Sequence, residues 1–156
     1  MSALNELSIA AAGAALRAGK ITSRALTEDA LARVAALDPK LNAFILVLRD
    51  RALAEADAAD ADFKSGRDRG PFHGIPYGIK DIYDLAGTST TCHSKLRLDA
   101  IATTDSVVAA KPRDMPLIHI SVSTRLLSSS YAVFRRPTKA RDYLHHTSIY
   151  FFQAFS

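Results

Sequence analysis

GIPYGIKD, at residues 74–81, is the stretch of sequence that decides the fold. Its apolar residues lie between glycines, and Pro76 would break a helix at this point, so the stretch predicts a short buried strand. Lys80 stands at the end of that strand. Burying a lysine is costly unless it is paired or used, and burial favours its neutral, basic form. The residues alone therefore leave two roles for Lys80: a surface ion pair with Asp81 or another carboxylate, or a functional base.

Length and composition fit one globular domain with a sizeable core. The chain has 156 residues, of which 48% are hydrophobic, which is not a disordered composition. The first residues lack the basic start and apolar core of a secretory signal, and the longest apolar run, residues 43–48, is too short to span a bilayer. Cys92 is the only cysteine, so no intrachain disulfide is expected. We expect a cytoplasmic protein without a membrane segment.

The net charge of +4 hides a change of character along the chain. Residues 1–110 contain 13 Lys or Arg and 14 Asp or Glu, whereas residues 111–156 contain seven and two. Alanine falls from 24 residues to three across the same boundary, and Gly87 is the last glycine. We interpret residues 1–111 as one unit and residues 112–156 as a divergent tail, either disordered or produced by a shifted reading frame.

Helices are expected to dominate the first 64 residues. Ser8 is placed to cap a helix that runs to about Ala18, with Gly19 as its stop. Thr22 or Ser23 is placed to cap a second helix, which residues 38–39 (Asp-Pro) should end. Residues 42–48 form either a short strand or the buried start of a third helix, which covers residues 49–64. The alternating charges of that third helix predict a solvated face.

The later part of the chain gives weaker patterns. Asp105 is placed to cap a helix that starts near Val107, and Pro112 fits badly inside it. Residues 118–122 alternate apolar and polar, which predicts a strand. The run TSTT at residues 88–91 predicts turns in which hydroxyl groups satisfy their own backbone.

Several stretches, taken in order, resemble the amidase signature family. They are LRAGKITS (16–23), AALDPKLNAF (35–44), GPFHGIPYGIKD (70–81), DLAGTSTT (84–91) and DSVVA (105–109). The third is the most specific, and the resemblance covers roughly residues 4–111. It implies an α/β fold with a mixed sheet core wrapped by helices, of which this chain holds the N-terminal part and is therefore incomplete.

The family resemblance also implies a chemistry. The family hydrolyses or transfers a carboxamide through a serine nucleophile, a second serine in a cis peptide, and a lysine. Only the lysine can be carried over, onto Lys80, as the general base at the head of the relay. Asp81 is then expected to support local structure rather than to react. The implied partner is a small-molecule amide, and simple amides, aryl amides, allophanate and amide transfer to charged tRNA all remain open as substrates.

The sequence departs from the family pattern at three places. The family's serines lie in a glycine- and serine-rich segment whose backbone amides stabilise an oxyanion. This chain has no glycine after Gly87, and its serine cluster at residues 128–130 is given no catalytic role. His93 stands where the family usually shows glycine, and the family's continuation is missing beyond Lys111. We therefore expect the chain alone to be inactive.

Other residue patterns predict no further site. Adjacent Cys92 and His93 lack metal-ligand spacing, so a structural role is expected and no metal or other cofactor is expected. His73 should pack or bond locally in its loop. Residues 74–80 are not a phosphate loop, because no Ser or Thr follows the lysine. The His pair at residues 145–146 is interpreted as an accident of the tail.

Two other kinds of function stay open on the sequence alone. The first is a non-catalytic fragment or protein-interaction module, which would associate with itself through the unpaired edge of an incomplete sheet. The second is a small basic nucleic-acid binder. Seven basic residues spread over 46 positions are thin evidence for that binder.

Overall fold

The computed structural model describes residues 4–114 and 118–123. Its helices are α1 (Ile9–Arg17), α2 (Ser23–Leu41), α3 (Arg49–Lys64) and α4 (Val107–Asp114), and its strands are β1 (Phe44–Val47), β2 (Pro76–Lys80) and β3 (Ile118–Ser123). Two short 3-10 helices, η1 (Leu4–Glu6) and η2 (Lys95–Arg97), complete the elements. The α/β class and the strand predicted around GIPYGIKD are both confirmed.

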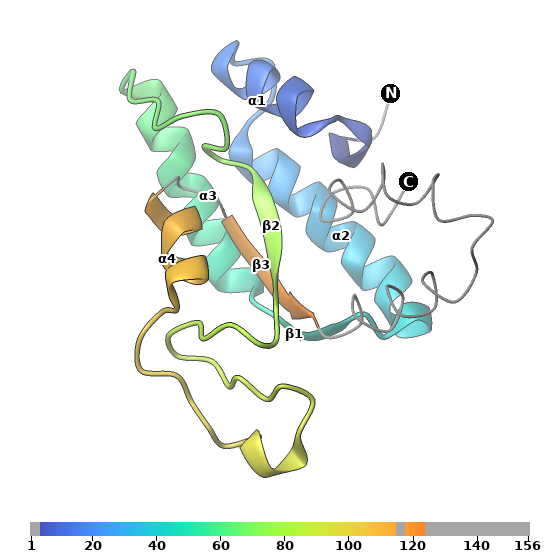
Figure 1. Cartoon of the computed structure of the whole chain (residues 1–156). Coiled ribbons are helices and arrows are strands. Elements are labelled where there is room, and N and C mark those ends of the chain that lie inside the picture. Colours follow the sequence, from blue (N-terminus) through green and yellow to red (C-terminus); the bar gives the residue numbers. More distant parts are fainter. Residues whose placement is uncertain (1–3, 115–117, 124–156) are drawn as a thin grey trace, which may run out of the picture.

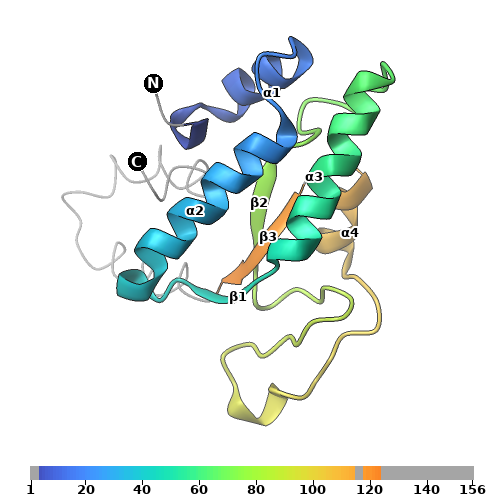
Figure 2. The same ribbon diagram turned by 180° about the vertical axis from the view of Figure 1, so that it is seen from behind.

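The three strands form one mixed sheet in the order β1-β3-β2. β3 runs antiparallel to β1 and parallel to β2. Helices α2 and α3 lie against one face of this sheet, in front of the strands in Figure 2 and behind them in Figure 1. The segment between β2 and α4 extends beyond the end of the sheet, away from α1, α2 and α3 (Figure 1). The central strand, β3, therefore comes after residue 111 in the sequence. The domain boundary that the sequence predicts at residue 111 stays a prediction.

Side-chain caps fix the starts of the first two helices. The Ser8 hydroxyl accepts the N–H of Ala11 at 3.2 Å, which begins α1 where the sequence predicts. In α2 the Thr22 hydroxyl accepts the N–H of Ala25 at 3.0 Å. Such bonds satisfy N–H groups that have no partner inside the helix. Residues 42–48, left open by the sequence, form β1 rather than the start of α3.

The second helix does not end at Asp38, so that prediction is wrong. It continues through Pro39 to Leu41, and Asn42 closes it in the left-handed conformation at φ 46° and ψ 47°. The Asn42 N–H donates to the Asp38 carbonyl at 2.7 Å, and the Asp38 carboxylate accepts the N–H groups of Ala43 and Phe44. Because Pro39 lies in the last turn, it removes a single helical hydrogen bond, and these contacts at the C-terminus offset the loss.

The fourth helix also differs from the prediction. It includes Pro112 and runs to Asp114. The proline lies in the second half of this eight-residue helix, where its fixed φ is compatible with helical backbone and costs one bond. The hydroxyl of Ser106 accepts the N–H of Ala109 at 3.3 Å, in the first turn of the helix. Asp105 accepts the N–H of Ala86 at 2.8 Å, which ties the start of α4 to the segment after β2.

Three apolar clusters hold the elements together. The first joins α1 and α2 to the turn before β2, the second joins α2 and α3 to β3, and the third joins β2 to α4. Leu26, Ile75, Leu85 and Ile118 are the large apolar side chains that are fully buried in them. Ala56 lies in the second cluster, and Leu53 and Phe63 pack from the edges of the second and first clusters.

The sequence predicts a solvated charged face for helix α3, but some of its carboxylates bind other elements. Its Asp60 carboxylate accepts the N–H groups of Ser23 and Arg24, at 2.7 and 3.1 Å, and so completes the cap of α2. Its Glu55 carboxylate accepts the backbone N–H of His119 at 2.8 Å and lies 3.3 Å from the ring nitrogen Nδ1. The other ring nitrogen of His119 is hydrogen-bonded to the hydroxyl of Tyr77. This Glu55–His119–Tyr77 network joins α3, β3 and β2.

The Asp60 cap gives a test of this architecture. Asp60→Ala leaves two N–H groups at the start of α2 without their acceptor, so the free energy of unfolding should fall by about 1 kcal/mol. The matched control is Asp57→Ala, one turn earlier on α3, which removes an exposed ion pair with Arg24 and should change stability by less than about 0.5 kcal/mol. Urea unfolding of both variants checks this. Equal losses would contradict the capping role.

The Glu55 network predicts a pH dependence. Burial alone raises the pKa of the Glu55 carboxyl, but hydrogen bonds from the His119 ring and backbone and from Arg51 outweigh it and lower that pKa from 4.5 to about 2. The unfolded carboxyl therefore binds its proton first as the pH falls. Its stabilising contribution is complete above about pH 5 and is lost as the pH falls towards the folded value, a loss of roughly 3 kcal/mol.

Unfolding measured between pH 6 and pH 2 tests this linkage. Glu55→Gln cannot titrate, so its free energy of unfolding should fall less steeply with acidification than that of the unmodified chain, by the amount just stated. Parallel pH profiles for the two proteins would show that the Glu55 carboxylate is not stabilised in the folded state.

Candidate functional site

Lys80 is half-buried at the carboxyl end of β2, where its backbone is in register with Ser123 of β3. The chain turns immediately afterwards, because the Lys80 carbonyl accepts the N–H groups of Ile82 at 2.8 Å and of Tyr83 at 3.1 Å. The sequence thus places this lysine correctly, at the end of a strand. Its amine is carried by a backbone that is fixed on both sides, by the sheet before it and by a tight turn after it.

The neighbouring carboxylate organises the segment that faces this turn. Asp81 is 1% exposed. It accepts the N–H of Thr91 at 2.7 Å and the hydroxyl of the same residue, and the N–H of His93 lies 3.4 Å from it. The Asp81 carbonyl also accepts the N–H of Cys92 at 3.1 Å. Its carboxylate is therefore used within the local structure, as predicted, and a surface ion pair is not its role.

Residues 91–94 form a turn with unusual backbone angles. Cys92 has φ 49° and His93 has φ 64°, the left-handed region that glycine enters most readily. The turn is closed by a bond from the Ser94 N–H to the Thr91 carbonyl at 2.9 Å. Each non-glycine residue in such a conformation carries a backbone strain energy of about 1–3 kcal/mol. His93, which stands where the family resemblance implies glycine, does adopt a glycine-like conformation.

The resulting site combines a basic side chain with an ordered turn. Lys80 is the last residue of β2. The Asp81 carboxylate, next in the chain, binds the turn that carries the exposed side chains of Cys92 and His93. A lysine held in this way can accept or donate a proton, provided that a nucleophile is supplied beside it. The predicted serine cluster at residues 128–130 and the His pair at 145–146 lie outside the described residues.

The start of β2 is fixed by a close approach that requires glycine. Gly74 has φ 75°, and a Cβ added there would lie 2.4 Å from the Ser23 hydroxyl oxygen. That hydroxyl donates to the Gly74 carbonyl at 2.5 Å. A side chain at residue 74 would therefore separate α2 from β2. This contact sets where the strand begins and hence where Lys80 lies, six residues later.

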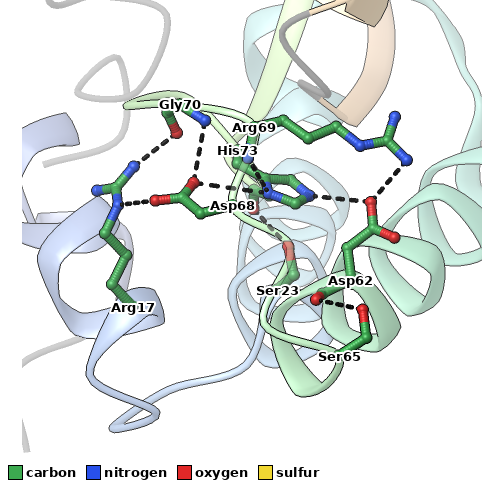
Figure 3. A network of polar contacts seen from close by, with 9 residues as sticks. Arg17, Ser23, Asp62, Ser65, Asp68, Arg69, Gly70 and His73 are labelled. Carbon is green, nitrogen blue, oxygen red and sulfur yellow. Dashed lines mark hydrogen bonds and ion pairs between the residues drawn. The ribbon is translucent and has the colours of Figure 1, made fainter.

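A second polar cluster surrounds His73, which is fully buried (Figure 3). Its Nδ1 accepts the N–H of Arg69 at 3.2 Å, and its ring stacks on Phe63 with centroids 4.3 Å apart. Asp62 and Asp68 flank the ring at 3.6 and 3.8 Å. Burial lowers the pKa of His73 and outweighs the two carboxylates, which act in the opposite direction. Local packing, as predicted, is therefore the role that the geometry supports.

Ion pairs extend this cluster to the neighbouring helices. Arg17 of α1 contacts the Asp68 carboxylate at 2.7 Å and donates to the Gly70 carbonyl at 2.6 Å. Arg69 contacts the Asp62 carboxylate of α3 at 2.7 Å. The hydrogen bond from Arg17 lowers the pKa of Asp68. Figure 3 shows that these groups join the loop before β2 to α1 and α3. The geometry therefore supports a structural role for the cluster rather than a catalytic one.

Two classes of site are missing from the described part of the chain. Within residues 4–114 and 118–123, no three His, Cys, Asp or Glu side chains are grouped so that they would hold a metal ion. In the same residues, no helix combines the length and apolarity needed to cross a membrane.

Thr91 is the site residue that sequence reasoning missed. The run of hydroxyl residues predicted turns that satisfy their own backbone, and Thr88 does donate to the Leu85 carbonyl at 2.8 Å. The Thr91 hydroxyl instead binds the Asp81 carboxylate. An acidic residue directly after a buried strand, followed ten positions later by a hydroxyl residue, was the signal that could have found it.

Comparison with known proteins gives one family. The Amidase family model matches residues 25–129. The A subunit of glutamyl-tRNA(Gln) amidotransferase from Roseiflexus sp. (strain RS-1) is 40% identical over 111 residues, which is 71% of this chain and 23% of that protein. An amidase from Pseudomonas putida is 38% identical over 94 residues, covering 60% of this chain and 20% of the relative. The chain thus spans about a quarter of the length of the relatives it matches.

A solved structure shows the same arrangement of elements. The peptide amidase from Stenotrophomonas maltophilia superimposes with a TM-score of 0.71 and 34% sequence identity, over 76% of this chain and 24% of that one. The superimposed residues therefore have the fold of the matching quarter of that amidase. The family match passes through the composition break and ends at residue 129.

The Asp81 contacts give a stability prediction. Asp81→Asn keeps the shape of the side chain but weakens its bonds to the Thr91 and His93 groups, so the free energy of unfolding should fall by roughly 1–3 kcal/mol. Asp84→Asn, at an exposed position three residues later, is the matched control and should stay within about 0.5 kcal/mol of the unmodified chain. Thermal and urea unfolding measure both. An Asp81 variant as stable as the control would remove the carboxylate from its organising role.

Proposed function

This chain belongs to the amidase family, and from that premise we propose that it provides the general base of an enzyme that hydrolyses or transfers a carboxamide at its C–N bond. The observation that carries the proposal is the position of Lys80. It lies in the stretch that most resembles the family, at the end of β2, next to a buried carboxylate that orders the adjoining turn.

The proposed role of Lys80 is to take up a proton. In the relay that the family resemblance implies, the lysine amine accepts a proton from a serine in a cis peptide, and that serine activates the nucleophilic serine. A neutral amine is required for this step. Asp81 is proposed to position the turn at residues 91–94 and not to exchange protons with the substrate.

The proposed relay is incomplete within these 156 residues. The nucleophile and its oxyanion donors require a glycine- and serine-rich segment, and the sequence has no glycine after Gly87. We therefore expect the isolated chain to show negligible amide hydrolysis. The relatives, which are about four times longer than the part they share with this chain, are proposed to contain what it lacks.

The substrate is proposed only as a class, a small-molecule amide. One relative is named a peptide amidase, one an amidase, and one a subunit of a glutamyl-tRNA(Gln) amidotransferase. Three different names at similar identity favour no single amide. A cytoplasmic location remains a prediction from the sequence.

A second candidate function is that of a protein-interaction module. It is favoured by apolar side chains that stay exposed after β2 and along α4, among them Leu96, which is 97% exposed. Self-association through a sheet edge is one form of this candidate. The module and the enzyme are compatible if the partner carries the rest of the active site.

A chimera tests the proposed base. Residues 25–111 of this chain replace the matching part of the Stenotrophomonas maltophilia peptide amidase, and ammonia release is measured with a carboxamide that the parent enzyme cleaves. Lys80→Ala should lower kcat/KM by roughly 10²–10⁴-fold, the usual contribution of a general base. Lys64→Ala, at the last residue of α3, is the control and should leave the rate unchanged. A folded chimera whose activity survives Lys80→Ala would overturn the assignment.

A further inference from the structure

The register between β2 and β3 shifts three residues before the proposed base. Tyr77 of β2 pairs with His119 of β3. The next residue of β2, Gly78, pairs with Ser121, so the pairing skips one residue of β3. An irregularity of this kind re-aims the side chains that follow it, and such features are common next to active sites. Because the shift precedes Lys80, it decides which residue of β3 lies opposite that lysine.

Two registers are open to the end of β2. The observed shift places Lys80 opposite Ser123, and the same strands paired without it would place Lys80 opposite Val122. The strand is five residues long, begins with a proline and contains a glycine, a composition that specifies register weakly. Its buried Ile79 packs in the apolar cluster that joins β2 to α4. A directional contact between β2 and β3 is therefore needed to select one register.

Side chains provide such a contact at the last pair before the shift. The Tyr77 hydroxyl is hydrogen-bonded to Nε2 of His119, and the two ring centroids lie 4.6 Å apart. The other ring nitrogen, Nδ1, lies 3.3 Å from the Glu55 carboxylate. A carboxylate only accepts, so Nδ1 carries the proton, Nε2 accepts, and the Tyr77 hydroxyl donates. One tautomer of His119 therefore satisfies both partners, and the two bonds fix where Tyr77 lies along β3.

Helix α3 holds His119 by its backbone as well as by its ring. The Glu55 oxygen that faces the ring also accepts the His119 N–H at 2.8 Å. The second Glu55 oxygen accepts from the Arg51 side chain at 2.9 Å, which fixes the carboxylate itself. His119 is 1% exposed, so water does not compete for these bonds. The helix thus anchors β3 beside the shift, and Tyr77 transmits that anchor to β2.

We propose that the Glu55–His119–Tyr77 network positions Lys80, by locking the register shift that places this lysine opposite Ser123. The inference rests on the proposed function, because the exact place of Lys80 matters for catalysis only if its amine is the base. Tyr77 and His119 are positioning residues and exchange no proton with the substrate. A slip of one residue moves a strand by about 3.3 Å, and a misplacement of about 1 Å can already cost roughly 10²-fold in rate.

Removal of one hydroxyl tests the network by NMR on the full chain. In the unmodified chain, backbone NOE contacts should join Lys80 to Ser123. Tyr77→Phe keeps the ring and should weaken these contacts, and amides of residues 78–80 and 121–123 should exchange about tenfold faster, the size of one hydrogen bond. The matched control is Tyr83→Phe, which removes the same atom from a tyrosine that is 36% exposed and should change exchange by less than about twofold.

A second pair of variants separates positioning from stability. His119→Leu removes both ring contacts and should lose the register, whereas His119→Gln, whose amide can donate to Glu55 and accept from Tyr77, should keep it.

Two results would overturn the inference. The first is that Tyr77→Phe speeds exchange uniformly, in α2 as much as in β2 and β3, which would mean that the network only adds global stability. The second is that the contacts between Lys80 and Ser123 persist in Tyr77→Phe at full strength. An amidase chimera whose activity survives Lys80→Ala would instead refute the proposed function and leave the register inference standing.

Discussion

The candidate site depends on the buried carboxylate of Asp81 and on the hydrogen bonds that it accepts. It lies at the point where β2 ends and accepts bonds from the backbone and the hydroxyl of Thr91, ten residues further along the chain. A carboxylate that is 1% exposed must be fully satisfied by donors, since an unpaired buried charge is strongly unfavourable. Satisfying it forces residues 91–94 back towards the strand. The turn and the exposed positions of Cys92 and His93 are consequences of that requirement.

The other end of β2 is constrained with equal strictness. Gly74 leaves no room for a side chain against Ser23, and the His73 cluster ties the preceding loop to α1 and α3. The strand that carries Lys80 is therefore fixed at its start by shape and at its end by charge. Neither constraint involves a regular hydrogen-bond ladder, and both use residues within the stretch that resembles the amidase family most closely.

Sequence reasoning succeeded where the cause is local. The glycines and Pro76 predicted β2, and the hydroxyls of Ser8 and Thr22 predicted the helix starts, because each signal acts within a few residues of its effect. Two proline predictions were wrong. Pro39 and Pro112 both lie inside helices, since a proline near a helix end removes one bond, and caps or tertiary contacts offset that loss. The choice between strand and helix for residues 42–48 required knowledge of the pairing with β3.

The polar contacts of α3 were out of reach for a different reason. Glu55 meets His119 across 64 residues and Asp60 meets Ser23 across 37, so neither partner can be read from a periodic pattern. The residues of the candidate site likewise divide into those that the sequence predicts and those that it does not. Lys80 and Asp81 are adjacent and were predicted together, whereas the role of Thr91 depends on a turn whose shape only the folded chain reveals. The left-handed backbone of His93 is likewise invisible in composition, although its place in a family motif pointed to it.

The central claim is that the Asp81 carboxylate holds residues 91–94 against the end of β2. Hydrogen exchange of the Thr91 N–H, measured by NMR on the full chain, tests this claim most directly. We predict that this proton exchanges as slowly as the amides paired between β2 and β3, because its acceptor is buried and charged. Exchange at the rate of an unprotected loop amide would mean that the turn is not held by Asp81, and the proposed organisation of the site would fall with it.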